Sequence, residues 1–141
     1  MSSTPSTHLA IDRRLVGELL ELGEGTARAA LTLLPEMAAD DRGLVHGGFT
    51  FGLADYAAML AVKHPLVVLA SSSMKFLAPT RVGERLVAEA RVIEETGRRR
   101  RVGVEVRRDE EGMEVVASGE FLAVVPDRHV LDPPNLKELP A

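Results

Sequence analysis

The stretch Phe49–Val62, which reads FTFGLADYAAMLAV, decides how this chain folds. Nearly every residue in it is apolar or small, and apolar and polar residues do not alternate. That pattern indicates a helix that is apolar around most of its circumference, and such a helix is buried. Gly47 and Gly48 lie just before or at its start. His64-Pro65 closes it, because proline disfavours helical geometry in the preceding residue.

Strand patterns flank this helix on both sides. One precedes it, and a polar loop over 36–43 follows that strand. Four come after it, so the predicted strands are Thr26–Leu34, Leu66–Leu77, Arg85–Glu95, Arg98–Arg108 and Met113–Val125. A hydrophobic helix and a long antiparallel sheet bury each other only if the sheet curls around the helix. We therefore predict an α+β fold in which a curved antiparallel sheet wraps a long central helix.

Length and composition indicate a single globular domain. The chain has 141 residues, of which 45% are hydrophobic and 27% charged, and both fractions are near the averages for such domains. We expect this domain to cover residues 8–131. Residues 1–7 are expected to be a disordered N-terminus, and 132–141 a proline-rich C-terminal tail.

Charge and residue usage exclude several classes of protein. A formal net charge of −4 argues against a nucleic-acid partner, which usually needs a basic footprint. The chain has no cysteine and four scattered histidines, so we expect no disulfide, no metal site and no cofactor. The N-terminus lacks the basic and apolar regions of a signal peptide, and no stretch fits a membrane span. We therefore expect a cytoplasmic protein without a membrane partner.

Asp55 is the most informative residue of the predicted helix. It is the only charged residue between Arg42 and Lys63, and burying a lone carboxylate costs several kcal/mol unless it is paired or protonated. Two interpretations follow from the residues alone. Asp55 is either structural, in an ion pair with, for example, Lys75 or Arg81 or on a helix face that opens to solvent, or it is kept for chemistry.

The segment Gly43–Gly48 (GLVHGG) lies immediately before this helix. A helix N-terminus presents unpaired backbone N–H groups and the positive end of a dipole, and glycine lets a ligand approach that backbone closely. Such a place suits a carbonyl oxygen or a developing oxyanion. Taken alone, a pair of glycines is commonly just a tight entry turn, and a lone His46 is more often structural than a base.

The spacing between the His46-Gly47-Gly48 segment and Asp55 is more specific than either the segment or the aspartate alone. The run His46–Asp55 (HGGFTFGLAD) closely resembles the HGG-x4-LAD signature of hotdog-fold acyl-CoA thioesterases of the phenylacetate-pathway type. The resemblance continues through Phe76–Pro79 (FLAP) and Val82–Leu86 (VGERL), and it covers roughly Gly43–Val125. It implies the hotdog fold, in which one long helix is wrapped by a curved sheet.

The resemblance also implies roles for residues of this chain. The backbone N–H of Gly47 would polarise the thioester carbonyl, and Gly48 would lie beside the substrate. Asp55 of the opposite subunit would act as general base or nucleophile, and His46 would position the thioester or hold the loop. The protein would be a homo-oligomer, a dimer or a tetramer, with active sites between protomers. Long exposed strand edges also favour edge pairing between copies.

Further residues are predicted to contact an acyl-CoA substrate. Asp40 stands where many relatives carry an assisting asparagine, and it either raises a nearby pKa or points to solvent. Ser71 or Ser73 could supply a polar group facing the carboxylate, or the serines pack as small residues under the helix. Coenzyme A carries phosphates, for which Lys75 and the run Arg98–Arg101 are candidate cations, although charge runs on strands are usually solvated.

Two rival interpretations stay open. The segment Phe49–Val82, with Lys75 just before Phe76, also resembles the acyl-CoA-sensing hotdog domain of a bacterial repressor of fatty-acid synthesis, which binds its ligand without hydrolysing it. That regulator has asparagine at the position of Asp55 and a helix-turn-helix for which this N-terminus is too short, so we favour an enzyme. A dehydratase is less favoured, because the central helix carries no histidine.

Overall fold

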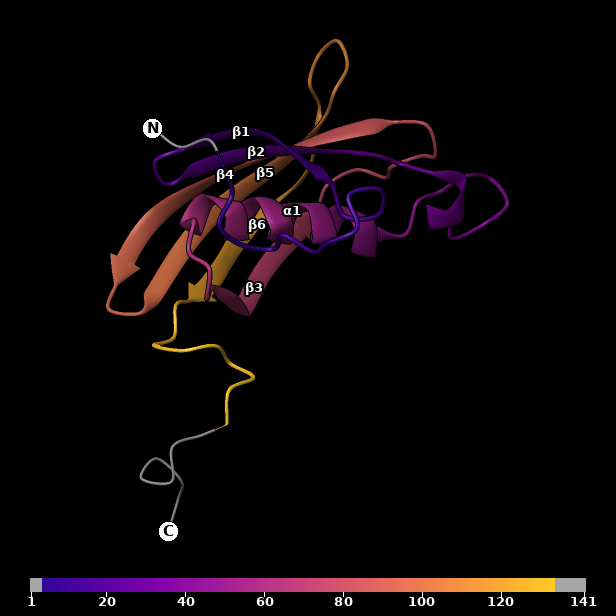
Figure 1. The fold of residues 1–141 in the computed structure, drawn as a ribbon. Helices are drawn as coiled ribbons and strands as arrows, with labels where there is room; N and C mark the ends of the chain where they lie inside the picture. Colours follow the sequence, from indigo (N-terminus) through magenta and orange to yellow (C-terminus); the bar gives the residue numbers. More distant parts are fainter. Residues whose placement is uncertain (1–3, 134–141) are drawn as a thin grey trace.

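In a computed structural model, residues 4–133 of the chain are described (Figure 1). Two strands, a short 3-10 helix and one long α-helix are followed by four more strands. Their bounds are β1 Glu18–Gly23, β2 Thr26–Thr32, η1 Pro35–Met37, α1 Gly47–Val62, β3 Val68–Phe76, β4 Arg85–Thr96, β5 Arg99–Arg108 and β6 Val115–Val124. The predicted helix and all five predicted strands are present.

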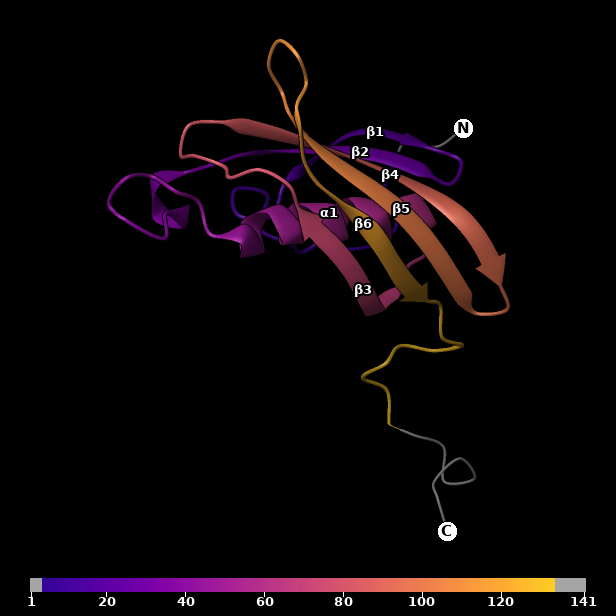
Figure 2. The same ribbon diagram turned by 180° about the vertical axis from the view of Figure 1, so that it is seen from behind.

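The six strands form one antiparallel sheet in the order β1-β2-β4-β5-β6-β3. The sheet curves around α1, which lies along its inner face, and Figure 2 shows the same arrangement from behind. The predicted hotdog fold, one long helix wrapped by a curved antiparallel sheet, is therefore confirmed. The order also makes β1 and β3 the edges of the sheet.

One strand, β1, was not predicted. Its sequence, ELLELG, does not alternate apolar and polar residues. The pairing with β2 explains why, because the register shifts between Leu19 and Glu21. Such a bulge inserts an extra residue and breaks the period of two on which recognition of a strand depends.

The core is built from small and medium aliphatic side chains, as the scarcity of aromatic residues requires. The face of α1 against the sheet is rich in alanine, and Ala54, Ala57 and Ala58 are each fully buried. Small side chains let the sheet approach the helix closely. The largest fully buried side chain is Phe121 on β6, whose ring centre lies 5.5 Å from that of Phe51 on α1.

The N-terminal segment packs against the helix before β1 begins (Figure 1). The rings of His8 and Tyr56 are 6.5 Å apart, and burial lowers the pKa of His8. Thr7 is only 5% exposed, so the end of the segment that we expected to be disordered is packed. Residues 1–3, and the predicted tail from 134 onward, lie outside the described residues.

Candidate active site

Asp55 lies in the middle of α1, and its side chain is mostly buried. Its Oδ1 atom is enclosed and has no hydrogen-bond partner within residues 4–133. Burial raises the pKa of Asp55 from an ordinary 3.8 to about 6. Among these residues, neither Lys75 nor Arg81 forms an ion pair with it. The interpretation of Asp55 as half of an ion pair with Lys75 or Arg81 therefore finds no support. A helix face that opens to solvent and a carboxylate kept for chemistry both remain.

The N-terminus of α1 is held in place by backbone hydrogen bonds from the loop that leads into it. The Val45 N–H donates to the Thr80 carbonyl at 2.8 Å, and the His46 N–H donates to the Met37 carbonyl at 3.0 Å. His46 is the extended N-cap residue, with φ −62° and ψ 129°. The N–H groups of Gly47 and Gly48, in the first turn, have no intrahelical acceptor. They form a fixed donor pair at the positive end of the helix.

Both glycines of this turn face aromatic rings. A Cβ on Gly48 would lie 2.9 Å from the ring of His46, which is exposed and stands edge-on to Phe49. A Cβ on Gly47 would meet the ring of Phe76, on β3, at 3.7 Å. The helix N-terminus is thus next to the end of β3. His46 covers Gly48 rather than capping the helix, since its side chain makes no cap hydrogen bond.

The distance between the two predicted catalytic groups decides how they can cooperate. Gly47 and Asp55 are eight residues apart on one helix, about 12 Å along its axis at about 1.5 Å per residue. A single carbonyl cannot contact a donor and a base at that separation, because each must lie within about 3.5 Å of the reacting atoms. The Gly47 N–H and the Asp55 carboxylate of one chain are therefore too far apart to contact the same carbonyl group.

The helix face that carries Asp55 is directed at the β6–β3 side of the sheet. Phe51 lies one turn before Asp55 on the same face and contacts Phe121 of β6. A Cβ on Gly52 would meet nothing within 4 Å. Phe76 at the end of β3 and Leu77 after it are more than half exposed, at 54% and 56%. The described chain therefore leaves this face open at the β3 edge.

The register of β3 decides on which side of the sheet each of its serines lies. Ser72 pairs with buried Phe121, and Ser73 pairs with exposed Glu120. Paired residues in a sheet share a face, so Ser72 is on the helix side. Ser71, Ser73 and Lys75 are on the outer side. Ser71 and Ser73 therefore do not face the Asp55 of their own chain. The side of each serine could not be predicted, because three consecutive serines carry no alternation that fixes it.

Asp40 serves the loop before the helix. Its Oδ1 accepts the N–H groups of Arg42 at 2.9 Å and Leu44 at 3.0 Å, and its side chain is exposed. This geometry is an Asx turn of the kind that Asp commonly makes. Burial is the cause of the raised pKa of Asp55, so Asp40 of the same chain does not contribute to that shift.

The arginine run at 98–101 lies at the end of the sheet remote from the helix N-terminus. It belongs to the β4–β5 turn, whereas Phe76, next to Gly47, pairs with β6 near its opposite end. Arg98 pairs with Asp127, Arg100 with Glu95, and Arg101 with Glu94 and Glu120. These ion pairs favour the solvated outer surface over a ligand site.

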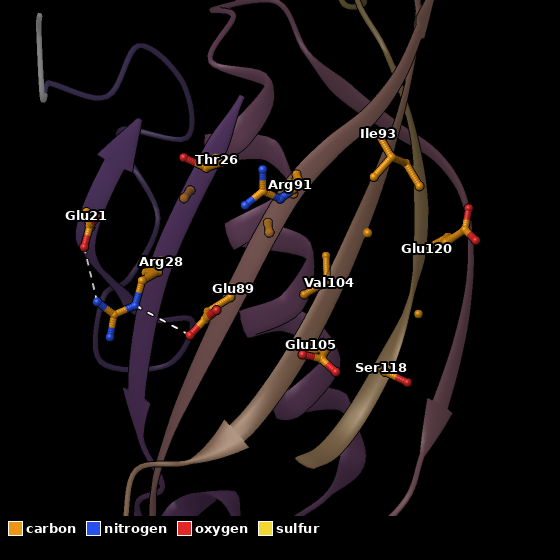
Figure 3. A pocket seen from close by; sticks show the side chains of 14 residues that line it. Glu21, Thr26, Arg28, Glu89, Arg91, Ile93, Val104, Glu105, Ser118 and Glu120 are labelled. Carbon is orange, nitrogen blue, oxygen red and sulfur yellow. Dashed lines mark hydrogen bonds and ion pairs between the residues drawn. The ribbon is translucent and has the colours of Figure 1, made fainter. Parts of the chain in front are cut away.

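A hollow of about 670 Å³ is also on the outer face (Figure 3). Its floor is the sheet itself, and Arg28 bridges Glu21 and Glu89 at one side. The sheet separates this hollow from α1, and therefore from Asp55 and Gly47. Residues 4–133 hold no group of three or more metal-binding side chains. None of their helices is long and apolar enough to cross a membrane.

Arg108 is a site-supporting residue that sequence reasoning missed. Its buried guanidinium donates to Glu84 at 2.7 Å, to Glu114 at 3.0 Å and to the Pro79 carbonyl at 2.6 Å. It thereby anchors the segment whose Thr80 carbonyl receives the Val45 N–H. The role of Arg108 could not be predicted from a local sequence pattern, because its partners Pro79 and Glu84 are 29 and 24 residues away.

The chain was compared with family models, curated proteins and solved structures. A model of the thioesterase superfamily matches residues 42–115, from the loop before α1 to the start of β6. An esterase-type protein from Deinococcus radiodurans is 40% identical over 112 residues, which are 78% of this chain and 73% of that protein. The crystal structure of protein PH1136 from Pyrococcus horikoshii superposes with a TM-score of 0.88 at 48% identity, covering 94% of this chain and 100% of that one.

Other similar proteins differ in length or name. A methylthioribose-1-phosphate isomerase from Aquifex aeolicus is 48% identical over 84% of this chain, but the match is only 25% of that protein. Transcription factor FapR from Shouchella clausii is 33% identical over 74% of this chain and 54% of its own length. The chain thus spans a quarter to about half of these two relatives. A variant of the phenylacetic acid degradation protein PaaI from Thermus thermophilus superposes with a TM-score of 0.70 at 29% identity, covering 78% of this chain and 93% of that one.

Proposed function

The chain belongs to the thioesterase superfamily, and on this premise we propose that it hydrolyses an acyl-coenzyme A thioester to a free acid and coenzyme A. The single observation that carries the proposal is the enclosed carboxylate of Asp55. Its Oδ1 has no partner within the described chain, and its pKa is raised to about 6, so it is ionised but basic near neutral pH. Stability gives no reason to keep such a group.

The proposed site lies between two protomers. Gly47 of one protomer and Asp55 of the other would approach one carbonyl, since about 12 Å of helix separates them within a chain. The exposed β3 edge and the open helix face beside it offer a surface on which a second copy can bring them together. A homodimer is the smallest assembly that completes the site, and a tetramer would contain two such dimers.

In the reaction, the thioester carbonyl oxygen accepts a hydrogen bond from the Gly47 N–H, and the helix dipole supports it. The carboxylate of Asp55 takes a proton from water while the water oxygen bonds to the carbonyl carbon. The resulting oxyanion collapses, the C–S bond breaks, and the thiolate of coenzyme A receives the proton from Asp55. If Asp55 instead attacks the carbonyl directly, an acyl anhydride forms and water then cleaves it. His46, exposed beside Gly48, would position the thioester.

Thiol release from a panel of acyl-CoA substrates tests the role of Asp55. We expect the wild type to turn over at least one of them, and Asp55→Asn and Asp55→Ala to lower kcat by orders of magnitude. Binding of the thioester should survive in both variants, because the carboxylate acts on the reacting atoms. Full activity in Asp55→Asn would remove the proposed base.

The role of the Gly47 N–H can be tested without disturbing the helix. Gly47 is the first helical residue, where proline is well tolerated, and His46 already has the extended backbone that precedes proline. Gly47→Pro therefore deletes the N–H and keeps the helix. Gly47→Ala is the matched control, because it keeps the N–H and adds a Cβ at ordinary contact distance from Phe76. We expect kcat to fall about a hundredfold more in the proline variant than in the alanine variant.

A non-catalytic acyl-CoA-binding module is the second candidate, favoured by the 33% identity to transcription factor FapR. In that case Asp55 would contact the ligand without reacting with it. Tight binding of acyl-CoA by the wild type, with no thiol released from any member of the panel, would support this candidate over the enzyme.

A further inference from the structure

A second hollow, of about 310 Å³, lies beside the loop that leads into α1. Its lining residues are Asp40, Arg42, Leu44, Pro79 and Arg81. Two segments meet to form it, since Leu44 bridges to Arg81 and the Val82 N–H donates to the Gly43 carbonyl at 2.9 Å. Unlike the larger outer hollow, this one is on the same side of the molecule as the helix N-terminus.

The arginines of this hollow differ from most others in the chain. Arg14, Arg28, Arg85, Arg98, Arg100, Arg101, Arg107 and Arg108 are engaged in ion pairs. The exposed guanidinium groups of Arg42 and Arg81 have no ion pair or hydrogen bond within residues 4–133, and only their backbone N–H groups are bonded. The acid of the lining, Asp40, already accepts two backbone N–H groups. The hollow therefore has an excess of positive charge available to a ligand.

The backbone that presents Arg81 is rigidly held. Its N–H donates to Glu84 at 2.6 Å, and the same carboxylate oxygen accepts from Arg108 at 2.7 Å. Arg108 also fixes the Pro79 carbonyl. The buried Arg108 and its partner Glu84 thus hold the loop that carries Arg81, while the guanidinium group of Arg81 stays available to a ligand. Because these contacts fix the loop in advance, the site is preorganised, which lowers the cost of binding a ligand.

The hollow is close to the carbonyl site. Leu44, which bridges to Arg81, is three residues before Gly47, so their Cα atoms are at most about 11 Å apart. The Val45 N–H, between them, bonds to Thr80. A ligand whose carbonyl lies at Gly47 and whose other end carries anions, joined by a flexible arm, would span this distance.

We propose that Arg42 and Arg81 form an anion subsite that binds the phosphate groups at the nucleotide end of a coenzyme A thioester. Arginine suits this task because its planar guanidinium donates two parallel hydrogen bonds to phosphate oxygens. The inference rests on the proposed function for the identity of the ligand. It replaces Lys75 and the run at 98–101, which lie on the outer surface, as the cations that meet coenzyme A.

The test compares Arg42→Ala/Arg81→Ala with Arg91→Ala/Arg99→Ala. The second pair removes the same charge from two exposed arginines that also lack ion pairs within residues 4–133, on the outer face and at the β4–β5 end. Each protein is assayed on an acyl-CoA and on the matching acyl-pantetheine, which has the same thioester but no phosphate. We expect the first variant to raise KM for acyl-CoA at least tenfold and to lose most of the preference for acyl-CoA over acyl-pantetheine. The control pair should keep that preference.

A binding measurement separates failure of the subsite from failure of the proposed function. Adenosine 3′,5′-bisphosphate, the nucleotide end of coenzyme A with one phosphate fewer, is titrated into each protein by calorimetry. Binding to the wild type and the control pair but not to Arg42→Ala/Arg81→Ala supports the subsite even if no thioester is hydrolysed. Equal binding and equal KM in both double variants would overturn the subsite, while hydrolysis by the wild type would leave the proposed function standing.

Discussion

At the scale of one residue, Asp55 is a carboxylate held among apolar side chains of the core. Its neighbours on α1 are alanines, leucine and tyrosine, all buried. Nothing in the described chain compensates its enclosed Oδ1. Loss of hydration is the cause of the raised pKa. The same loss of hydration makes the carboxylate a stronger base, so in the proposed reaction the cost to folding and the gain for chemistry would have one origin.

The pKa of Asp55 predicts how hydrolysis depends on pH. A general base or nucleophile must be ionised, so kcat/KM should rise with pH, bend near the Asp55 pKa of about 6 and then level off. A pH–rate profile on one acyl-CoA, at constant ionic strength, measures the bend. A profile that is flat from about two pH units below this pKa to about two units above it would argue against a carboxylate in this role.

The same pKa also predicts how the stability of the protein depends on pH. Raising the pH should favour the reaction but lower the contribution of Asp55 to stability. The folded state holds the Asp55 proton up to about pH 6, whereas the unfolded chain releases it near 3.8. The folded state therefore binds more protons in this window, and the Asp55 contribution to the free energy of unfolding falls as pH rises through it. Asp55→Asn should be more stable than the wild type at about pH 7.5, by about 1 to 2 kcal/mol after allowing for the exposed part of the side chain.

Urea unfolding at about pH 4 and about pH 7.5 measures this difference, with exposed Asp41→Asn as the control. The gain from Asp55→Asn should be present at the higher pH and largely gone at the lower one, where Asp55 is protonated in the folded wild type. A variant that is less stable than the wild type at the higher pH would mean that the carboxylate has a stabilising partner in the folded protein.

At the scale of elements, the placement of β3 is the critical step, because this edge strand ends against Gly47 at Phe76. It lies unusually close to β6 at Gly119, where an added Cβ would come 2.2 Å from the Ser73 carbonyl oxygen and 2.8 Å from the Cα of Met74. Backbone atoms cannot yield as a flexible side chain can. Glycine at this position is therefore required for β3 to pair where it does.

Gly119→Ala should accordingly destabilise the protein by about 2 to 3 kcal/mol, as overpacking against fixed atoms does. Gly103→Ala is the control on the adjacent strand β5, since its Cβ would meet only Ile93 at 3.9 Å. It should be neutral or slightly stabilising, because alanine loses less backbone entropy than glycine. Denaturant midpoints of the two variants give the comparison. Equal midpoints would show that β3 moves freely relative to β6.

Sequence alone predicted the elements whose patterns are local. The helix was predicted from an apolar run, β3 from a run of β-branched and small residues that stops at Pro79, and β4 to β6 from alternation between turns. All were predicted to within two residues of their ends. Strand β1 was missed because a bulge at Leu19 and Glu21 breaks its period. The face of each serine on β3 was not predictable, because register comes from pairing with β6 rather than from the strand itself.

The residues of the candidate site also divide into those that the sequence predicted and those that it could not. Asp55 stood out as a single charge in an apolar helix, and Gly47 as part of a motif just before it. Arg108 could not be found, because its partners Glu84 and Pro79 come from distant parts of the chain. The hollow beside Arg42 likewise exists only where two loops meet.

At the scale of the whole molecule, the proposed account requires two copies. The N-terminus of α1 supplies hydrogen-bond donors, and its middle supplies a base, but about 12 Å separates them. An open helix face, exposed Phe76 and Leu77, and the β3 edge of the sheet all lie on the side where a second copy would complete the site. Oligomer formation and activity would then be lost together on dilution.

Activity of mixed oligomers of Gly47→Pro and Asp55→Asn tests this claim most directly. Each variant alone should be nearly inactive, because every site in it lacks the N–H or the carboxylate. Unfolding and refolding an equal mixture should restore about a quarter of wild-type activity, since about half of the dimers would be mixed and each would hold one intact site. No recovery from a mixture shown by mass to contain mixed oligomers would contradict a site shared between protomers.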